Sequence, residues 1–288
     1  MSQAEIFKSH IIDVVQSPSP ANSAEVESKA HQPRPRPASI TQRIEAPARP
    51  PVEAIAPRPV EAITTFAWAS TPVTLIEEVE LPQELDPRLV MLQAPGSPEA
   101  RSYRLLLHRL FAQGDPRVIA VTSAEPGEGK TTCAANLALA LSEAPLSRVL
   151  LVDANLTRPG VADLFCFEPS DSFMIKLLRS EDSSPPFGVA SIGGSSLQLA
   201  ALAPSTSEGK RLDRVLFGEA LRGLRSAYDY IVIDAASVFE SADVNSVGQC
   251  ADGVVVATRA GKSKKSKVAR AIRQLEPARV IGSVLLDA

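Results

Sequence analysis

Alternation of strands and helices is the feature of this sequence that most constrains its fold. Six short apolar runs, rich in valine, isoleucine and leucine, recur after residue 117 with helix-patterned stretches between several of them. They read VIAVTS (118–123), RVLLVDA (148–154), LQLAAL (197–202), YIVIDA (230–235), GVVVATR (253–259) and VIGSVLL (280–286). Continuously apolar strands are buried on both faces, and helical connections between them favour parallel pairing. We therefore predict an α/β fold: a mainly parallel sheet flanked by helices on both faces.

The first apolar run leads directly into a loop that contains two glycines and a lysine, and a helical stretch follows. The loop reads Ala124-Glu125-Pro126-Gly127-Glu128-Gly129-Lys130-Thr131-Thr132. Glycines allow backbone amides to curl around phosphate oxygens, and a helix N-terminus adds partial positive charge. Lys130 is expected to reach the outer phosphates, and Thr131 to ligate Mg²⁺. A chance glycine-rich turn is the alternative. The strand before the loop and the helix after it favour an ATP site formed by residues 125–132.

Two aspartates stand at the ends of other predicted strands. Asp153 is the last residue but one of the run 148–154, and Asp234 is the last but one of the run 230–235. In a parallel sheet both strand ends lie at the edge where ligands bind, beside the phosphate loop. Carboxylates there can hold Mg²⁺ or accept a proton from an attacking hydroxyl, although such an aspartate can also merely cap the next turn. We predict Thr131, Asp153 and Asp234 as metal ligands, and Lys130, Asp153 and Asp234 as the catalytic set.

The N-terminal third has a different composition from the rest. Residues 1–100 hold 15 of the 24 prolines and one of the 15 glycines. Proline fixes φ and lacks an amide donor, so helices and central strands do not persist through such spacing. We predict a proline-rich lead over residues 1–93, disordered at 15–60, and a nucleotide-binding domain over 94–288. The stretch Thr64–Ile76 is either a docking segment for a partner or a strand or coil that packs on the domain.

Composition also limits the possible location and partners. The formal net charge of −3 offers no general electrostatic basis for nucleic-acid binding. No apolar stretch approaches the ~18 residues of a membrane-spanning helix, and the N-terminus lacks a signal-peptide core. The three cysteines are scattered and form no metal-ligand pattern. We expect a cytoplasmic protein.

Three segments together resemble the bacterial tyrosine kinases of capsule and exopolysaccharide synthesis. That family lies within the P-loop NTPase class, beside the partition and septum-site ATPases. VIAVTSAEPGEGKTTCAANLALALS is similar to its Walker A segment, VLLVDANLTRPGVADLF to its second motif, and YDYIVIDAASVFESADVNSV to its Walker B strand. The resemblance covers residues 94–288. The partition ATPases carry a lysine where this chain has Glu125, which favours the kinase branch.

The resemblance implies a set of roles and partners. Lys130 and Thr131 would bind phosphates and Mg²⁺, Asp234 would organise the metal shell, and Asp153 would bind the metal or help to activate a tyrosine hydroxyl. Arg158 matches the arginine that closes the second motif and is expected to contact the nucleotide. A separate membrane chain-length protein of the polysaccharide co-polymerase type would be the partner, and would bring this chain to the inner membrane. A protein phosphoacceptor and a homo-oligomer are further expectations.

Departures from the family pattern leave three functions open. Asn155 stands where the second motif has another aspartate, and the C-terminal tyrosine cluster is absent. The first function is a tyrosine kinase that acts on another protein. The second is a catalytically weak, regulatory nucleotide-binding subunit of the same system. The third is a partition- or positioning-type ATPase.

Overall fold

The computed structural model describes residues 73–112, 114–169, 174, 177, 187–193, 195–203, 205 and 210–286. Residues 15–60, for which we predict disorder, are not among the described residues. Most of the stretch Thr64–Ile76 is not among them either. No helix in the described ranges is both long and apolar enough to span a lipid bilayer.

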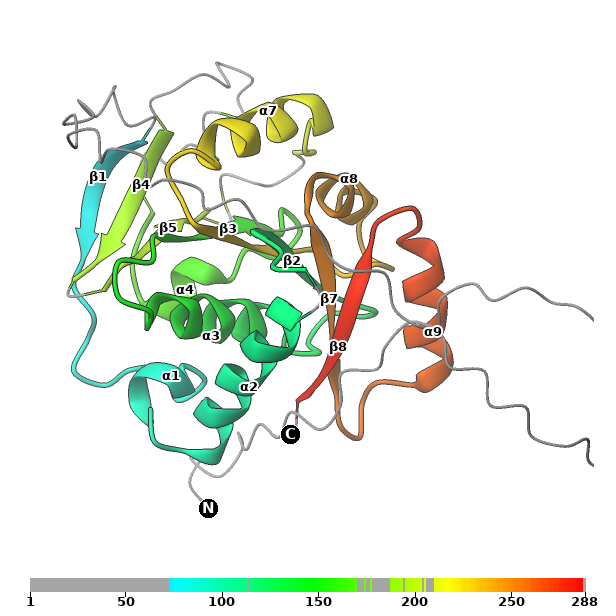
Figure 1. The fold of residues 1–288 in the computed structure, drawn as a ribbon. Coiled ribbons are helices and arrows are strands. Elements are labelled where there is room, and N and C mark those ends of the chain that lie inside the picture. The colour runs from blue at the N-terminus through cyan, green and yellow to red at the C-terminus, as the bar shows by residue number, and fades with distance from the viewer. Residues whose placement is uncertain are drawn as a thin grey trace, which may run out of the picture. The chain divides into compact units, whose positions relative to one another are not determined.

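One eight-stranded sheet organises the described residues (Figure 1). Its spatial order is β1-β4-β5-β3-β6-β2-β7-β8, and every pairing is parallel except that of β4 with β5. The strands are β1 (Val73–Val79), β2 (Val118–Ser123), β3 (Val149–Ala154), β4 (Phe187–Ile192), β5 (Leu197–Ala200), β6 (Tyr230–Ala235), β7 (Gly253–Arg259) and β8 (Val280–Leu286). The predicted mainly parallel sheet is confirmed.

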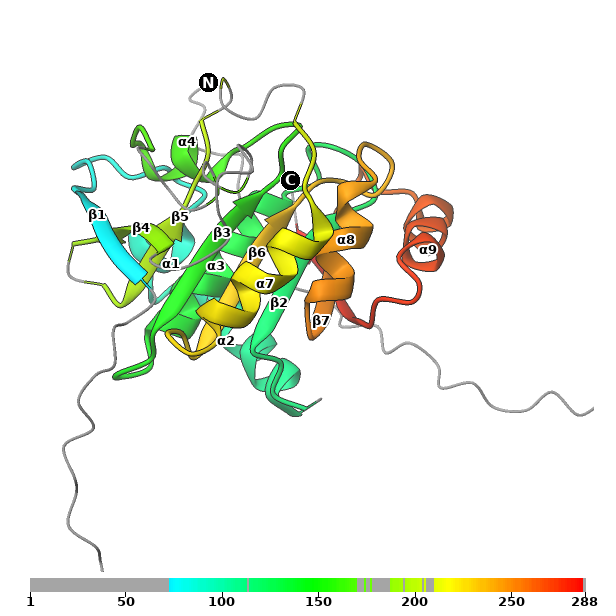
Figure 2. The same cartoon turned by 90° about the horizontal axis from the view of Figure 1, so that it is seen from above.

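Helices cover both faces of this sheet, as predicted (Figures 1 and 2). One face carries α1 (Val90–Gln93), α2 (Pro98–Ala112), α3 (Lys130–Ser142) and α4 (Val161–Phe165). The other carries α7 (Arg214–Leu224), α8 (Asp243–Cys250) and α9 (Lys265–Gln274). Successive residues of β2 alternate between the two layers: Ile119 and Val121 pack with α3, whereas Val118 and Ala120 pack with the opposite helices. This alternation explains why the central strands are apolar at nearly every position.

Two elements precede residue 94, the expected start of the domain. Strand β1 pairs in parallel with β4 at one edge of the sheet, and α1 packs against α3. Glu77 and Glu78 interrupt the apolar pattern of β1, because an edge strand is only partly covered. Because of this mixed pattern, the sequence did not predict that a strand continues past Ile76. Strand β4 and helix α8 were likewise not predicted.

Candidate active site

The phosphate loop connects the end of β2 to the start of α3. Gly127 and Gly129 have φ angles of 75° and 89°, a left-handed conformation that side-chain-bearing residues rarely adopt. A Cβ atom on Gly129 would lie 2.5 Å from Leu286 Cδ1, so this position is also closed sterically. The Ser123 hydroxyl donates to the Glu125 carbonyl at 2.8 Å, and the Glu125 amide donates to the Glu128 carboxylate at 2.8 Å. These contacts fix the entry to the loop.

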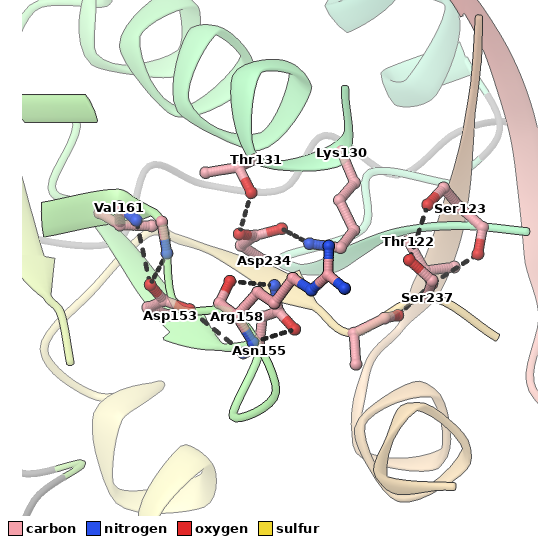
Figure 3. Close-up of polar contacts among 12 residues, drawn as sticks. Thr122, Ser123, Lys130, Thr131, Asp153, Asn155, Arg158, Val161, Asp234 and Ser237 are labelled. Carbon is pink, nitrogen blue, oxygen red and sulfur yellow. Dashed lines mark hydrogen bonds and ion pairs between the residues drawn. The ribbon is translucent and has the colours of Figure 1, made fainter. Parts of the chain in front are cut away.

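The first two residues of α3 meet Asp234 at the end of β6 (Figure 3). The Thr131 hydroxyl donates to Asp234 Oδ2 at 2.6 Å, and Lys130 Nζ lies 3.8 Å from Asp234 Oδ1. Asp234 is fully buried, and its Oδ1 atom accepts no hydrogen bond from any described residue. Buried carboxylate oxygens are normally paired, so this atom marks a place for a further donor or a cation.

Asp153 lies directly beside Asp234, because the two are partners in the register of β3 with β6. One of its oxygens accepts from the Gly160 and Val161 amides at 2.9 and 3.0 Å, and the other from the Asn155 amide at 3.1 Å. Asp153 therefore caps the turn that follows β3, which is the capping role considered from the sequence. It also lies beside Asp234 at the centre of the site.

Burial dominates the electrostatics of this carboxylate pair. Desolvation raises the pKa of Asp153 to about 7, and the neighbouring charge of Asp234 adds to the rise. Desolvation also raises the pKa of Asp234, while Lys130 and the Thr131 hydroxyl lower it. Without a metal ion, Lys130 supplies a single positive charge to two adjacent buried carboxylates, so the pair can hold a proton near neutral pH.

This shift predicts how stability depends on pH. Between pH 4 and 7 the folded chain keeps a proton on Asp153 that the unfolded chain has released. The free energy of unfolding therefore falls as pH rises through this window, by at most about 1.4 kcal/mol per pH unit. In Asp153→Asn this part of the slope is expected to vanish. Urea unfolding in EDTA at pH 5, 6 and 7 measures it, with the exposed Asp163→Asn as control. Equal slopes in wild type and Asp153→Asn would refute the assignment.

Asn155 and Arg158 shape the loop after β3. The Asn155 side-chain amide donates to the Arg158 carbonyl at 2.5 Å, and the Arg158 amide approaches Asn155 Oδ1 at 3.4 Å. The Arg158 guanidinium lies 3.3 Å from a Glu240 oxygen, and 71% of its side chain is exposed. Arg158 is thus held at the rim of the site (Figure 3).

The structure separates the predicted loop residues into two groups. Lys130 and Thr131 point towards the aspartates, and Thr132 is buried in the first turn of α3. The side chains of Glu125 and Glu128 instead contact residues that follow β7. The Glu125 amide donates to Glu128 and Pro126 has no amide, so Gly127, Glu128 and Gly129 are the residues of this group that can offer a backbone amide to a ligand.

Two links to the segment after β6 were missed by sequence reasoning. The Ser123 and Ser237 hydroxyls lie 3.2 Å apart, and the Thr122 hydroxyl donates to the Ala236 carbonyl at 2.6 Å. These contacts join the end of β2 to the residues after Asp234. Single hydroxyl residues at strand ends carry no distinctive spacing, so no sequence signal pointed to the pairing.

The donor set fits a magnesium ion that is shared with phosphates. Asp153, Asp234 and Thr131 are oxygen ligands, the type that Mg²⁺ prefers. No third histidine, cysteine, aspartate or glutamate of the described chain joins the two aspartates in a metal-binding group. A cation here would need phosphate or water oxygens to complete its shell, as is usual for Mg²⁺ at nucleotide sites. Asp234 Oδ1, which accepts no hydrogen bond from the described residues, fits the same arrangement.

Sequence comparison finds relatives among bacterial tyrosine kinases, while no family model matches. The succinoglycan biosynthesis transport protein ExoP of Rhizobium meliloti is 29% identical over 206 residues, which is 68% of this chain and 26% of ExoP. The tyrosine-protein kinase YwqD of Bacillus subtilis is 29% identical over 203 residues, 68% of this chain and 84% of YwqD. The chain thus spans about a quarter of ExoP but most of YwqD.

Solved structures share the fold. The VpsO kinase domain is 27% identical with a TM-score of 0.55, over 70% of this chain and 94% of that domain. The kinase domain of the Escherichia coli tyrosine kinase ETK has the same TM-score at 20% identity, over 68% of this chain and 78% of that domain. The resemblance to bacterial tyrosine kinases of capsule and exopolysaccharide synthesis, first seen in three motifs, is therefore confirmed by relatives named for succinoglycan biosynthesis and for tyrosine kinase activity, and by a fold shared with two solved tyrosine kinase domains.

Proposed function

We propose that this chain is an ATP- and Mg²⁺-dependent protein tyrosine kinase of exopolysaccharide or capsule synthesis that phosphorylates another protein. The observation that carries the proposal is the meeting of three elements at one point. Lys130 and Thr131 begin α3 beside Asp234, and Asp153 is the register partner of Asp234 on the neighbouring strand. A phosphate loop, a cation and two carboxylates are the groups that phosphoryl transfer requires.

Each residue has a defined task in this proposal. The backbone amides of residues 127–132 bind phosphate oxygens, and Lys130 carries positive charge to them. Thr131, Asp234 and Asp153 hold the metal. MgATP, when bound, supplies the phosphoryl group and a cation that offsets its charge. The alternative role of Asp153, when it does not hold the metal, is to accept the proton of a tyrosine hydroxyl, since burial raises its pKa to about 7 in the absence of a bound cation. Arg158, at the rim, is placed to contact the nucleotide or the entering substrate.

We further propose that the chain works at the cytoplasmic side of the inner membrane with a separate chain-length protein of the co-polymerase type. The relatives named for succinoglycan transport and for tyrosine kinase activity support this setting. No helix in the described part of the chain would cross a membrane by itself. A second protein is therefore the proposed route of attachment.

One observation favours a second candidate, a regulatory nucleotide-binding subunit with weak catalysis. Asn155 uses its amide nitrogen as a donor to the Arg158 carbonyl, a contact that a charged carboxylate cannot make. The loop is therefore built around the amide, not around a second acid. The partition ATPases carry a lysine at the position of Glu125. In this chain Glu125 is paired with Lys267, so a partition-type ATPase is less well supported.

A transfer assay separates these candidates. Purified chain with MgATP and a synthetic Glu/Tyr copolymer is expected to label tyrosine, and Asp234→Asn is expected to abolish the label. Exposed Asp163→Asn serves as the matched control and keeps full activity. Normal ATP binding without label, even with the cytosolic part of the membrane partner present, would contradict the kinase and favour the regulatory subunit. Absence of ATP binding would contradict both.

A further inference from the structure

The outer side of the phosphate loop is held by one segment, residues 259–267, which runs from the last residue of β7 into the first turn of α9. Lys262 Nζ donates to the Pro126 carbonyl at 3.0 Å, and Lys267 Nζ lies 2.5 Å from a Glu125 oxygen. The Arg259 guanidinium also approaches the Gly127 carbonyl, at 3.5 Å. We call residues 259–267 the brace.

Ser263 joins the brace to the loop through the Glu128 carboxylate. Its hydroxyl donates to Glu128 Oε1 and accepts from the Arg259 amide at 2.8 Å. The other Glu128 oxygen accepts from the Glu125 amide at 2.8 Å. Glu128 is almost completely buried, so both of its oxygens are committed to these contacts. The brace and the loop therefore form one hydrogen-bonded unit.

Lys262 sets the direction of a loop amide. The Pro126 carbonyl and the Gly127 amide belong to the same planar trans peptide, in which C=O and N–H point to opposite sides. Because Lys262 holds the carbonyl on the outside, the Gly127 amide points away from the brace. A Cβ atom on residue 127 would lie 2.6 Å from Lys262 Nζ, so a side chain there would displace the end of the lysine from its present position.

The contacts single out two lysines from a basic run that consists of Lys262, Lys264, Lys265, Lys267, Arg270 and Arg273. Within the described residues, the side chains of Lys264 and Lys265 are exposed and make no hydrogen bond or ion pair, as is usual at a solvated helix start. Lys262 and Lys267 instead reach back across 136 and 142 residues of sequence to the loop. A solvated surface therefore accounts for part of the run, but not for these two positions.

We propose that Lys262 and Lys267 are positioning residues of the nucleotide site, which fix the loop conformation whose amides bind the β-phosphate of ATP or ADP. They act from outside, through the Pro126 carbonyl and the Glu125 carboxylate, and do not touch the nucleotide. The proposal rests on the proposed nucleotide binding. It means that the brace contributes to nucleotide binding by positioning the phosphate loop.

Lys262→Met tests the main contact, with Lys265→Met as the matched control from the same segment. The loss of one orienting hydrogen bond is expected to weaken MgATP and MgADP binding about three- to tenfold in calorimetric titration. Lys262→Arg, which keeps a donor, is expected to bind within about twofold of wild type, and Lys265→Met to be unchanged. Without nucleotide, the melting temperatures of all variants are expected to agree within about 2 °C, because these are surface changes.

A double-mutant cycle tests the second contact. Lys267→Met and Glu125→Ala are each expected to weaken MgADP binding, and the double variant to be no weaker than the worse single variant. Unchanged affinity in Lys262→Met, or an equal loss in Lys265→Met, would overturn the positioning role while leaving nucleotide binding intact. Failure of wild type itself to bind MgATP or MgADP would instead overturn the proposed function.

Discussion

Lys130→Met is expected to weaken MgATP binding at least tenfold, which corresponds to about 1.4 kcal/mol or more. Lys130 Nζ lies 3.8 Å from Asp234 and is the cation at the centre of the site. Without it, the buried carboxylates of Asp153 and Asp234 face the phosphates with no protein charge to offset them. Asp234 would also lose the cation that lowers its pKa, so it would hold a proton more readily and bind a metal less well.

Calorimetric titration of wild type and Lys130→Met with MgATP measures this effect. Lys265→Met is the control for loss of a lysine as such, since Lys265 is exposed at the start of α9. A melting curve of each variant without nucleotide shows whether the site has stayed folded. Equal affinity of wild type and a folded Lys130→Met would contradict both the site and the proposed function.

The central strands were predictable because burial on both faces makes them apolar at almost every position. Strands β2, β3, β6, β7 and β8 fall within one residue of the predicted runs. The edge strand β1 was not predictable, since Glu77 and Glu78 lie within it and only part of the strand is covered. Helix α8 is short and mixed in polarity, and the burial of Val244 and Val247 follows from tertiary packing.

The same contrast holds for the candidate site. That Lys130, Thr131, Asp153 and Asp234 would share one edge of the sheet follows from strand order, and the structure brings them together. Their roles in binding and catalysis stay predictions. The partners of Glu125 and Glu128 were not predictable, because the brace is more than 130 residues away and its lysines look like an ordinary solvated run.

The remaining prediction is that the purified chain labels its own tyrosines at least tenfold less than it labels a Glu/Tyr copolymer. All three tyrosines of the sequence lie in the described residues. Tyr103 is fully buried, and Tyr228, also buried, donates its hydroxyl to Gln198. Tyr230 is the first residue of β6, and its hydroxyl approaches Asp115 at 3.2 Å. Delivery of Tyr103 or Tyr228 to another active site requires local unfolding, and delivery of Tyr230 requires unravelling the start of β6.

Two features could limit self-labelling: the inaccessibility of the tyrosines and the missing carboxylate at position 155. The Asn155→Asp variant distinguishes between them. An ionised aspartate at 155 cannot donate to the Arg158 carbonyl, and its charge would stand beside the buried pair of Asp153 and Asp234. We expect the variant to be less stable by about 1–3 kcal/mol and still not to label itself, because Tyr103 and Tyr228 stay buried and Tyr230 stays within the start of β6. Incubation with labelled ATP, followed by phosphotyrosine analysis, measures both forms. Strong self-labelling by wild type would contradict the burial argument, and self-labelling gained only in Asn155→Asp would show that the missing carboxylate limits transfer.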